Sequence, residues 1–172
     1  MSFEIIKSYA KINLSLNVIK RKSNNYHAIE SLVTFVEFSD KIKIKYITKK
    51  THNISFSGKF SKDIKKNNNT VVKLLQLLEK KKLLKKKIKI QVIKNIPQQS
   101  GMGGGSMNAA SILKYLMKKK IINISNKKAK ELAYKIGSDV ILGLENKNII
   151  LFKNGKTASL NNKLNFYVLI VM

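Results

Sequence analysis

The stretch KNIPQQSGMGGGSMNAASIL, Lys94 to Leu113, decides the fold that this sequence predicts. It follows an alternating apolar segment and contains four glycines within five residues, at positions 101, 103, 104 and 105. Glycine takes positive φ without strain, and successive N–H groups in such a turn converge on an anion. The stretch therefore predicts a phosphate-binding loop between a strand and a helix.

The helix is expected to have Ser106 as its N-cap and to run from Met107 to Met117, where apolar residues recur at helical spacing. Its N-terminus adds the positive end of a helix dipole to the loop amides, which favours a bound phosphate. A flexible glycine-rich linker is the alternative interpretation, although linkers are rarely flanked so closely by a strand and a helix. The glycine spacing matches neither GxxxxGKS/T nor GxGxxG.

Apolar and polar residues alternate along much of the first third of the chain, which predicts a sheet. Strands are expected at residues 3–18, 26–38, 41–47, 53–56, 88–93, 149–152 and 164–171. Two further helices are expected, one at 71–84 after an Asn69-Thr70 cap, and one from the Ser125 cap to residue 135 with Gly137 as its stop. This order contains no repeating βαβ unit, so the predicted fold class is α+β.

The composition excludes several classes of protein. The chain has 172 residues, enough for one domain with its own core, and no cysteine, so a disulfide framework, a thiolate metal site and a cysteine nucleophile are excluded. The N-terminus does not read as a signal peptide, and no segment reaches membrane-spanning length, so a cytoplasmic protein is expected. His52 has no partner at metal-ligand spacing, so no transition-metal site is expected.

The charge is strongly positive, with 35 Lys and Arg against 9 Asp and Glu and a net charge of +26. This excess favours polyanions in general. However, Arg21 is the only arginine, and arginine is the residue that reads bases and clamps phosphates bidentately. The lysines are spread along the chain, so we expect a solvated basic surface and no nucleic-acid partner; a basic binding protein without catalysis is the alternative.

Two polar residues outside the glycine loop are suited to phosphoryl transfer. Such a reaction needs a group to take the proton of the acceptor hydroxyl and cations to neutralise phosphate oxygens. Asp139, in the small-residue stretch after Gly137, could be the base, and Lys11, on the polar face of the first strand, could hold it ionised. The structural alternatives are that Asp139 caps a turn and that Lys11 is an ordinary surface lysine.

Tyr26 and His27 form a second conspicuous pair, because the chain has only two histidines. A tyrosine and a histidine on a loop can stack on a base and hydrogen-bond its edge. Both residues can equally serve packing alone.

Three segments together resemble one family. SYAKINLSLNVIKRKSNNYHAIESL, residues 8–32, resembles the opening of the 4-diphosphocytidyl-2-C-methyl-D-erythritol kinases, whose pattern is AKINL followed by an Arg and DGYHE. IPQQSGMGGGSMNAAS resembles their PxGxGLGGGSSNAA loop, and IGSDVILGL resembles their GADVPFF segment. The loop alone would indicate only the wider GHMP kinase superfamily; AKINL with YH narrows the resemblance to this family.

The resemblance implies the GHMP-kinase N-terminal domain, a ribosomal protein S5 domain 2-like mixed sheet with helices packed on it. It implies ATP-dependent phosphorylation of the 2-hydroxyl of 4-diphosphocytidyl-2-C-methyl-D-erythritol, on the non-mevalonate route to isoprenoids, with ATP and Mg²⁺ as cofactors. The expected partners are ATP and this cytidine diphosphate-linked methylerythritol, with no membrane; a homodimer is compatible with this reading.

Residue roles follow from the same resemblance by motif position. Asp139 corresponds to the catalytic base and Lys11 to its partner. Asn13, Tyr26 and His27 correspond to substrate-binding residues. The ATP site corresponds to the loop and its surroundings, namely Lys94, Pro97, Gly101, Gly103, Gly104, Gly105, Ser106 and Asn108. No protein residue is assigned as a metal ligand.

The chain departs from the family pattern at four places. Asn24-Asn25 replaces the Asp-Gly before YH, Gln99 replaces the first glycine after the proline, Met107 replaces a serine and Ile141 replaces a proline. The family also has a second α/β domain after a strand that YVLIVM resembles. We therefore expect an N-terminal ATP-binding domain at 1–160 and, at 161–172, only the first strand of a second domain. A truncated or inactive kinase is the alternative within the same fold.

Overall fold

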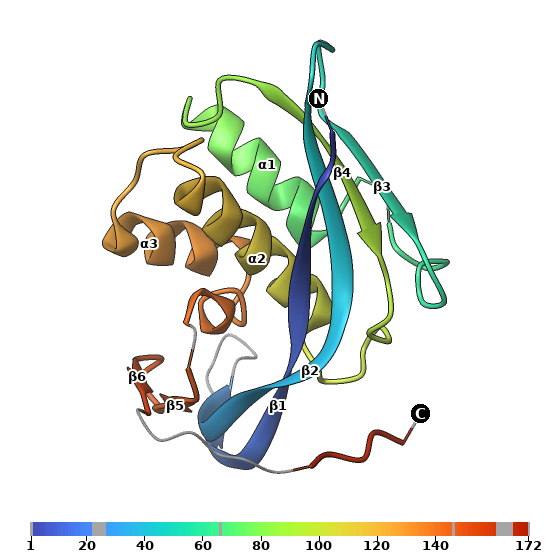
Figure 1. The fold of residues 1–172 in the computed structure, drawn as a ribbon. Coiled ribbons are helices and arrows are strands. Elements are labelled where there is room, and N and C mark those ends of the chain that lie inside the picture. The colour runs from blue at the N-terminus through green and yellow to red at the C-terminus, as the bar shows by residue number, and fades with distance from the viewer. Residues whose placement is uncertain (1, 22–26, 66, 146, 161–166, 172) are drawn as a thin grey trace.

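The computed structural model describes residues 2–21, 27–65, 67–145, 147–160 and 167–171. In these residues, three helices lie on one face of a six-stranded mixed sheet (Figure 1). The strands are β1 (Glu4–Arg21), β2 (His27–Ile47), β3 (Asn53–Ser57), β4 (Lys87–Ile93), β5 (Ile149–Leu151) and β6 (Thr157–Ser159). The helices are α1 (Thr70–Lys80), α2 (Gly104–Lys118), α3 (Asn126–Ile136) and the short 3-10 helix η1 (Leu142–Leu144). The α+β prediction is confirmed.

Strand β2 organises the sheet. The two extended segments predicted at 26–38 and 41–47 form one continuous strand, which pairs with β1 along one edge. Its other edge is shared, because β5 pairs with Ser31 to Val33 and β4 pairs with Lys41 to Ile47. Of the described strands, none pairs with this edge between Val33 and Lys41. The start of α2 faces this interval, where Met107 packs near Val33.

The core lies between the sheet and the helices, and strand alternation determines which residues enter it. Ile42 and Ile44 of β2 are fully buried on the helix side, whereas Lys43 between them points to the opposite face. Buried apolar residues of β4 and of all three helices complete the main cluster, namely Ile88, Ile90, Val92, Leu74, Leu78, Leu113, Leu116 and Leu132. Strand β3 adds to β4 in parallel at the edge of the sheet, as the sequence predicts for an edge strand.

Helices α1 and α2 end in the same way, without glycine. After α1, the N–H groups of Lys82 and Leu83 donate to the carbonyls of Glu79 and Leu78, with Lys82 at φ 54°. After α2, Lys120 adopts the same left-handed conformation. This is a Schellman motif with lysine at the position that glycine usually occupies. Because no glycine marks the stop, the prediction that the first helix extends to residue 84 was wrong by four residues.

The end of the chain also differs from the prediction. Residues 167–171 lie in irregular chain, so the strand predicted at 164–171 is wrong for the part that the structure describes. Ile170 packs against a small cluster made by Ala10, Ile96 and Met102. The sequence did not predict β6, a three-residue strand that pairs with β5.

Candidate active site

The glycine loop forms the open N-terminus of α2. Gln99, Gly101 and Gly103 all have positive φ, at 57°, 74° and 66°, so the backbone between Pro97 and the helix takes left-handed conformations at three residues. The N-cap is Gly103, which has no side chain to cap the helix. The prediction of Ser106 as the N-cap was wrong, because the helix begins at Gly104 and Ser106 lies inside its first turn. The first N–H groups of α2 are therefore available to an external acceptor.

Close packing around the loop requires glycine at two positions. A Cβ at Gly104 would lie 2.9 Å from the Lys94 ammonium and 3.0 Å from Ile96. A Cβ at Gly103 would lie 3.0 Å from the side chain of Lys11. Any larger residue would push the helix start away from the strands beneath it.

A cavity of about 420 Å³ opens in front of the helix start. All eight residues predicted for ATP binding line it: Lys94, Pro97, Gly101, Gly103, Gly104, Gly105, Ser106 and Asn108. Asp139 lies in the same wall. The structure adds Asn69 and Thr70 at the start of α1, where the Thr70 hydroxyl donates to the Gly105 carbonyl at 2.5 Å. From their sequence, these two residues were expected only to cap a helix. Their place in the wall of the cavity was not predicted.

Lys94 lies beneath the loop, and its charge is already paired. Its ammonium forms an ion pair with Asp40, and both side chains are almost entirely buried, 4% and 0% exposed. Asn108 donates from its amide to the same carboxylate at 2.9 Å, while its own amide oxygen has no protein partner among the described residues. Asp40 was missed from the sequence, although it lies in phase with the buried Ile42 and Ile44.

Lys11 and Asp139 come together at the edge of the cavity, as predicted. The Lys11 ammonium lies 3.6 Å from the Asp139 carboxylate and donates a 3.0 Å hydrogen bond to the Asn13 side chain. The Lys11 side chain is 9% exposed and that of Asp139 is 41% exposed. The backbone N–H of Lys11 donates to the Met102 carbonyl at 3.1 Å, so the loop and β1 are joined at this point.

The remaining predicted site residues are only partly described. Tyr26 lies outside the described residues, and His27 is the first residue of β2, opposite Arg21. Within the described residues, no group of three or more His, Cys, Asp or Glu side chains is placed to hold a metal ion. The helices that the structure describes are too short or too polar to cross a membrane.

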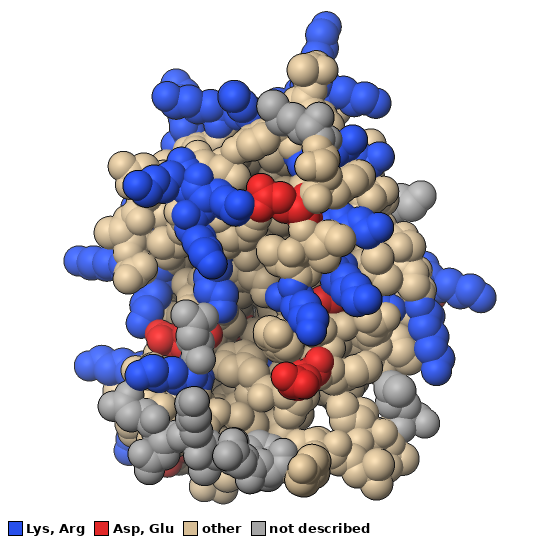
Figure 2. All heavy atoms as spheres, in the orientation of Figure 1, with Lys and Arg blue, Asp and Glu red and all other residues tan. Residues whose placement is uncertain are grey.

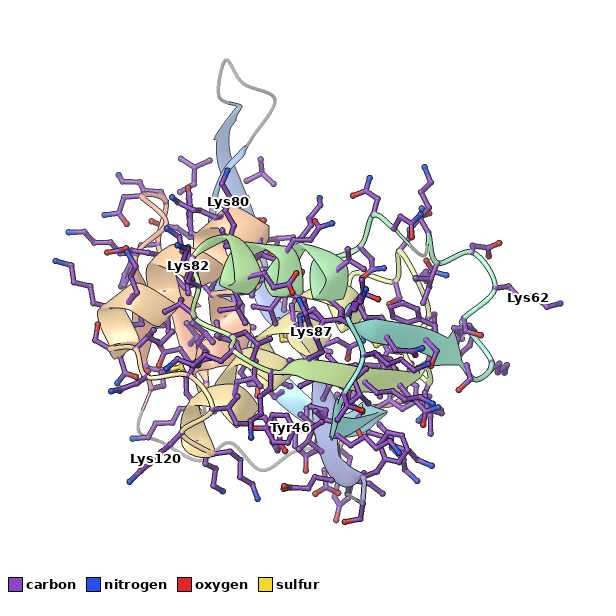
Figure 3. The ribbon with its side chains drawn as sticks, turned by 90° about the horizontal axis from the view of Figure 1, so that it is seen from above. Tyr46, Lys62, Lys80, Lys82, Lys87 and Lys120 are labelled. Carbon is purple, nitrogen blue, oxygen red and sulfur yellow. The ribbon has the colours of Figure 1, made fainter. Side chains whose placement is uncertain are left out.

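Lysines cover the face shown in Figure 2, over helices and strands alike, with few acidic residues between them. In Figure 3, Lys62 and Lys120 project away from the body of the molecule, whereas Lys87 lies close to α1. Lys87 pairs there with Glu79. The spread of the lysines agrees with the expected solvated basic surface.

Comparison with known proteins shows what the chain is similar to. Residues 69–152 match the family model described as GHMP kinases N terminal domain. A 4-diphosphocytidyl-2-C-methyl-D-erythritol kinase of Pelagibacter ubique is 51% identical over 96% of this chain and 58% of its own length. The corresponding kinase of Ehrlichia canis is 37% identical over 87% of the chain and 51% of its own length. The chain thus spans little more than half the length of these relatives.

Solved structures share the fold. A crystal structure of 4-(cytidine 5'-diphospho)-2C-methyl-D-erythritol kinase matches with a TM-score of 0.67 at 24% identity, over 86% of this chain and 51% of that chain. A homoserine kinase from Cytophaga hutchinsonii matches with a TM-score of 0.60 at 15% identity, over 93% of this chain and 54% of that chain.

Proposed function

We propose that this chain, which carries a GHMP kinase N-terminal domain, provides the ATP-binding half of a kinase that phosphorylates the 2-hydroxyl of 4-diphosphocytidyl-2-C-methyl-D-erythritol. Support for the substrate comes from the relatives, whose names say that they are 4-diphosphocytidyl-2-C-methyl-D-erythritol kinases. The proposal includes a cytoplasmic location and allows a homodimer.

The observation that carries the proposal is the position of Asp139 relative to α2. Its carboxylate lies in the wall of the cavity that the helix N-terminus faces. A triphosphate held by the first amides of α2 would therefore present its terminal phosphate toward Asp139. The partly exposed carboxylate can accept a proton from an alcohol, and the buried Lys11 ammonium lies 3.6 Å from it.

Each protein group has one task in this scheme. The amides of Gly104, Gly105 and Ser106 bind phosphate oxygens, and the Lys11 ammonium orients the Asp139 carboxylate beside it. Bound Mg²⁺ would neutralise charge on the phosphates. Ser106 and Asn108 supply oxygen donors of the kind that Mg²⁺ prefers, and the unpartnered amide oxygen of Asn108 fits this use.

The acceptor is expected to approach from the side of the β1–β2 hairpin. Asn13 already contacts Lys11, and Tyr26 and His27 are proposed to bind the cytosine base. The relatives are longer, so we propose that the part of them that this chain does not match completes the acceptor site. Transfer by the chain alone is then expected to be slow even if it binds ATP.

Nucleotide binding gives the direct test. Titration of the chain with a non-hydrolysable ATP analogue and Mg²⁺ should give saturable binding, and Gly104→Val should abolish it, because the added side chain occupies the space beside Lys94 and Ile96. Gly137→Ala is the matched control, since a Cβ there meets only Val140 at 3.6 Å. Binding that is indifferent to Gly104→Val would contradict the proposal and would favour a basic protein that binds polyanions non-specifically.

A further inference from the structure

Asp40 is the one carboxylate that is fully buried among the described residues, in a chain with only 9 acidic residues. It lies on the helix side of β2, in phase with Ile42 and Ile44. A buried charge is costly unless it is paired and hydrogen-bonded, so its surroundings indicate its use.

Four donors converge on this carboxylate from two other elements. One oxygen accepts from the backbone N–H groups of Asn95 and Ile96, at 2.7 Å and 2.9 Å. The other oxygen pairs with the Lys94 ammonium and accepts from the amide of Asn108. Asp40 thus contacts both the segment that enters the glycine loop and the helix that leaves it.

The location of Asp40 explains why a side chain is needed here. Pairing between β2 and β4 ends at Lys41 and Ile93, and Asp40 is the next residue of β2. Beyond Ile93 the chain turns away toward Pro97, so the N–H groups of residues 95 and 96 cannot bond to a β2 carbonyl. The Asp40 carboxylate takes the place of the missing strand partner and fixes the direction in which the chain enters the loop.

The second oxygen fixes the other side of the loop. It holds the Lys94 ammonium under Gly104, 2.9 Å from the position that a Cβ would take. It also holds Asn108, one turn further along α2, by its side-chain amide. The start of α2 is thereby tied to the end of β4 through a single carboxylate.

We propose that Asp40 is a positioning residue for the nucleotide site: it sets the geometry of the glycine loop by holding residues 94–96 and α2 in a fixed relation, without touching the nucleotide. Only the nucleotide readout below rests on the proposed function. A purely stabilising role is the competing explanation, and it predicts no local effect on the loop.

The test compares two double variants that share the Lys94→Met change. Asp40→Asn with Lys94→Met keeps a carbonyl oxygen for the amides of Asn95 and Ile96, and its NH₂ group can donate to the amide oxygen of Asn108 after a flip. Asp40→Leu with Lys94→Met places a side chain of similar shape at position 40 but removes the oxygen that accepts from Asn95 and Ile96. Because the side chains at positions 40 and 94 are uncharged in both variants, neither variant contains an unpaired buried charge at these positions.

Hydrogen exchange of residues 95–103 is the first readout and needs no nucleotide. Exchange is expected to be at least tenfold faster in the Leu variant than in the Asn variant, while β1 and α3 exchange alike in both. Affinity for a non-hydrolysable ATP analogue, measured where both variants are folded, is expected to be at least tenfold weaker in the Leu variant. If the Leu variant does not fold, Asp40→Ser with Lys94→Met replaces it. The serine side chain is too short for its hydroxyl to reach the N–H groups of both Asn95 and Ile96.

Equal exchange in the two variants, or faster exchange spread evenly over the whole chain, would overturn the positioning role. Equal nucleotide affinity despite a local change in exchange would overturn it as well. Absence of nucleotide binding by the unsubstituted chain would instead overturn the proposed function, and the exchange data would still decide whether Asp40 anchors the loop.

Discussion

The Lys11 ammonium lies 3.6 Å from the Asp139 carboxylate, although one residue belongs to the first strand and the other follows the third helix. The Lys11 side chain is almost buried, whereas Asp139 is partly exposed and lines the cavity. The arrangement separates the two tasks of the pair. In the proposed function, the exposed Asp139 carboxylate meets the acceptor hydroxyl while the buried Lys11 ammonium holds its position.

Asp139→Asn is expected to reduce phosphoryl transfer by about 100-fold or more, since general-base catalysis contributes on this scale. ADP release in the presence of the acceptor measures transfer. Affinity for an ATP analogue should change less than about threefold, because the helix amides are untouched.

Asp63→Asn is the matched control for this substitution, because Asp63 is an exposed acid on the loop before α1. It removes the same charge from the chain without altering the cavity. Equal transfer rates for the two variants would show that Asp139 is not the base.

Gly143 is fixed by contact with α2, and this gives a prediction about stability. A Cβ at Gly143 would lie 2.5 Å from the Cβ of Ala110 and 3.1 Å from the sulfur of Met107. Gly143→Ala is therefore expected to lower the free energy of unfolding by about 1 to 3 kcal/mol, the usual cost of overpacking a core. Denaturant titration measures it. Adding Ala110→Gly should recover part of the loss, and a double variant no more stable than Gly143→Ala alone would show that the strain lies elsewhere.

Local rules were sufficient to predict a glycine loop between a strand and a helix, and the family resemblance supplied the eight predicted residues that line its cavity. Glycine clustering, strand alternation and helical spacing are properties of short segments. The same rules place Asp139 near a turn and Lys11 on a strand, and their meeting was inferred from the needs of phosphoryl transfer and from the family pattern. Their contact depends on the loop crossing β1, which no short segment specifies.

Three features escaped sequence reasoning for identifiable reasons. The helix after the loop begins at a glycine and not at Ser106, and the backbone of Gly104 lies close against Lys94 and Ile96. The first helix ends early at a lysine with positive φ, a conformation that sequence rules reserve for glycine or asparagine. Asp40 appears as one polar residue between strand segments, and its burial follows from β4 leaving the sheet beside it.

His52 connects stability to pH. Its ring nitrogen Nδ1 accepts from the Ile88 N–H at 3.0 Å, and Nε2 lies 3.1 Å from Glu79, which also pairs with Lys87. Burial lowers the pKa of His52 below its usual 6.5, and this outweighs the opposite effect of Glu79. The folded state therefore disfavours the proton that the unfolded state takes up, so His52 contributes stability above pH 6.5 that is lost as the pH falls through the lower folded pKa.

The midpoint of thermal unfolding is accordingly expected to fall as the pH is lowered from about 7.5 to 5.5, with a free-energy slope below about 1.4 kcal/mol per pH unit, the limit for one proton. His52→Asn keeps an acceptor for Ile88 and removes the titration, so its slope should be flatter in this range. His27→Asn removes the other histidine of the chain and should leave the slope unchanged. If the slope persisted in His52→Asn and disappeared in His27→Asn, the pH dependence would arise from His27 and not from His52. No other side-chain type titrates in this range at its ordinary pKa.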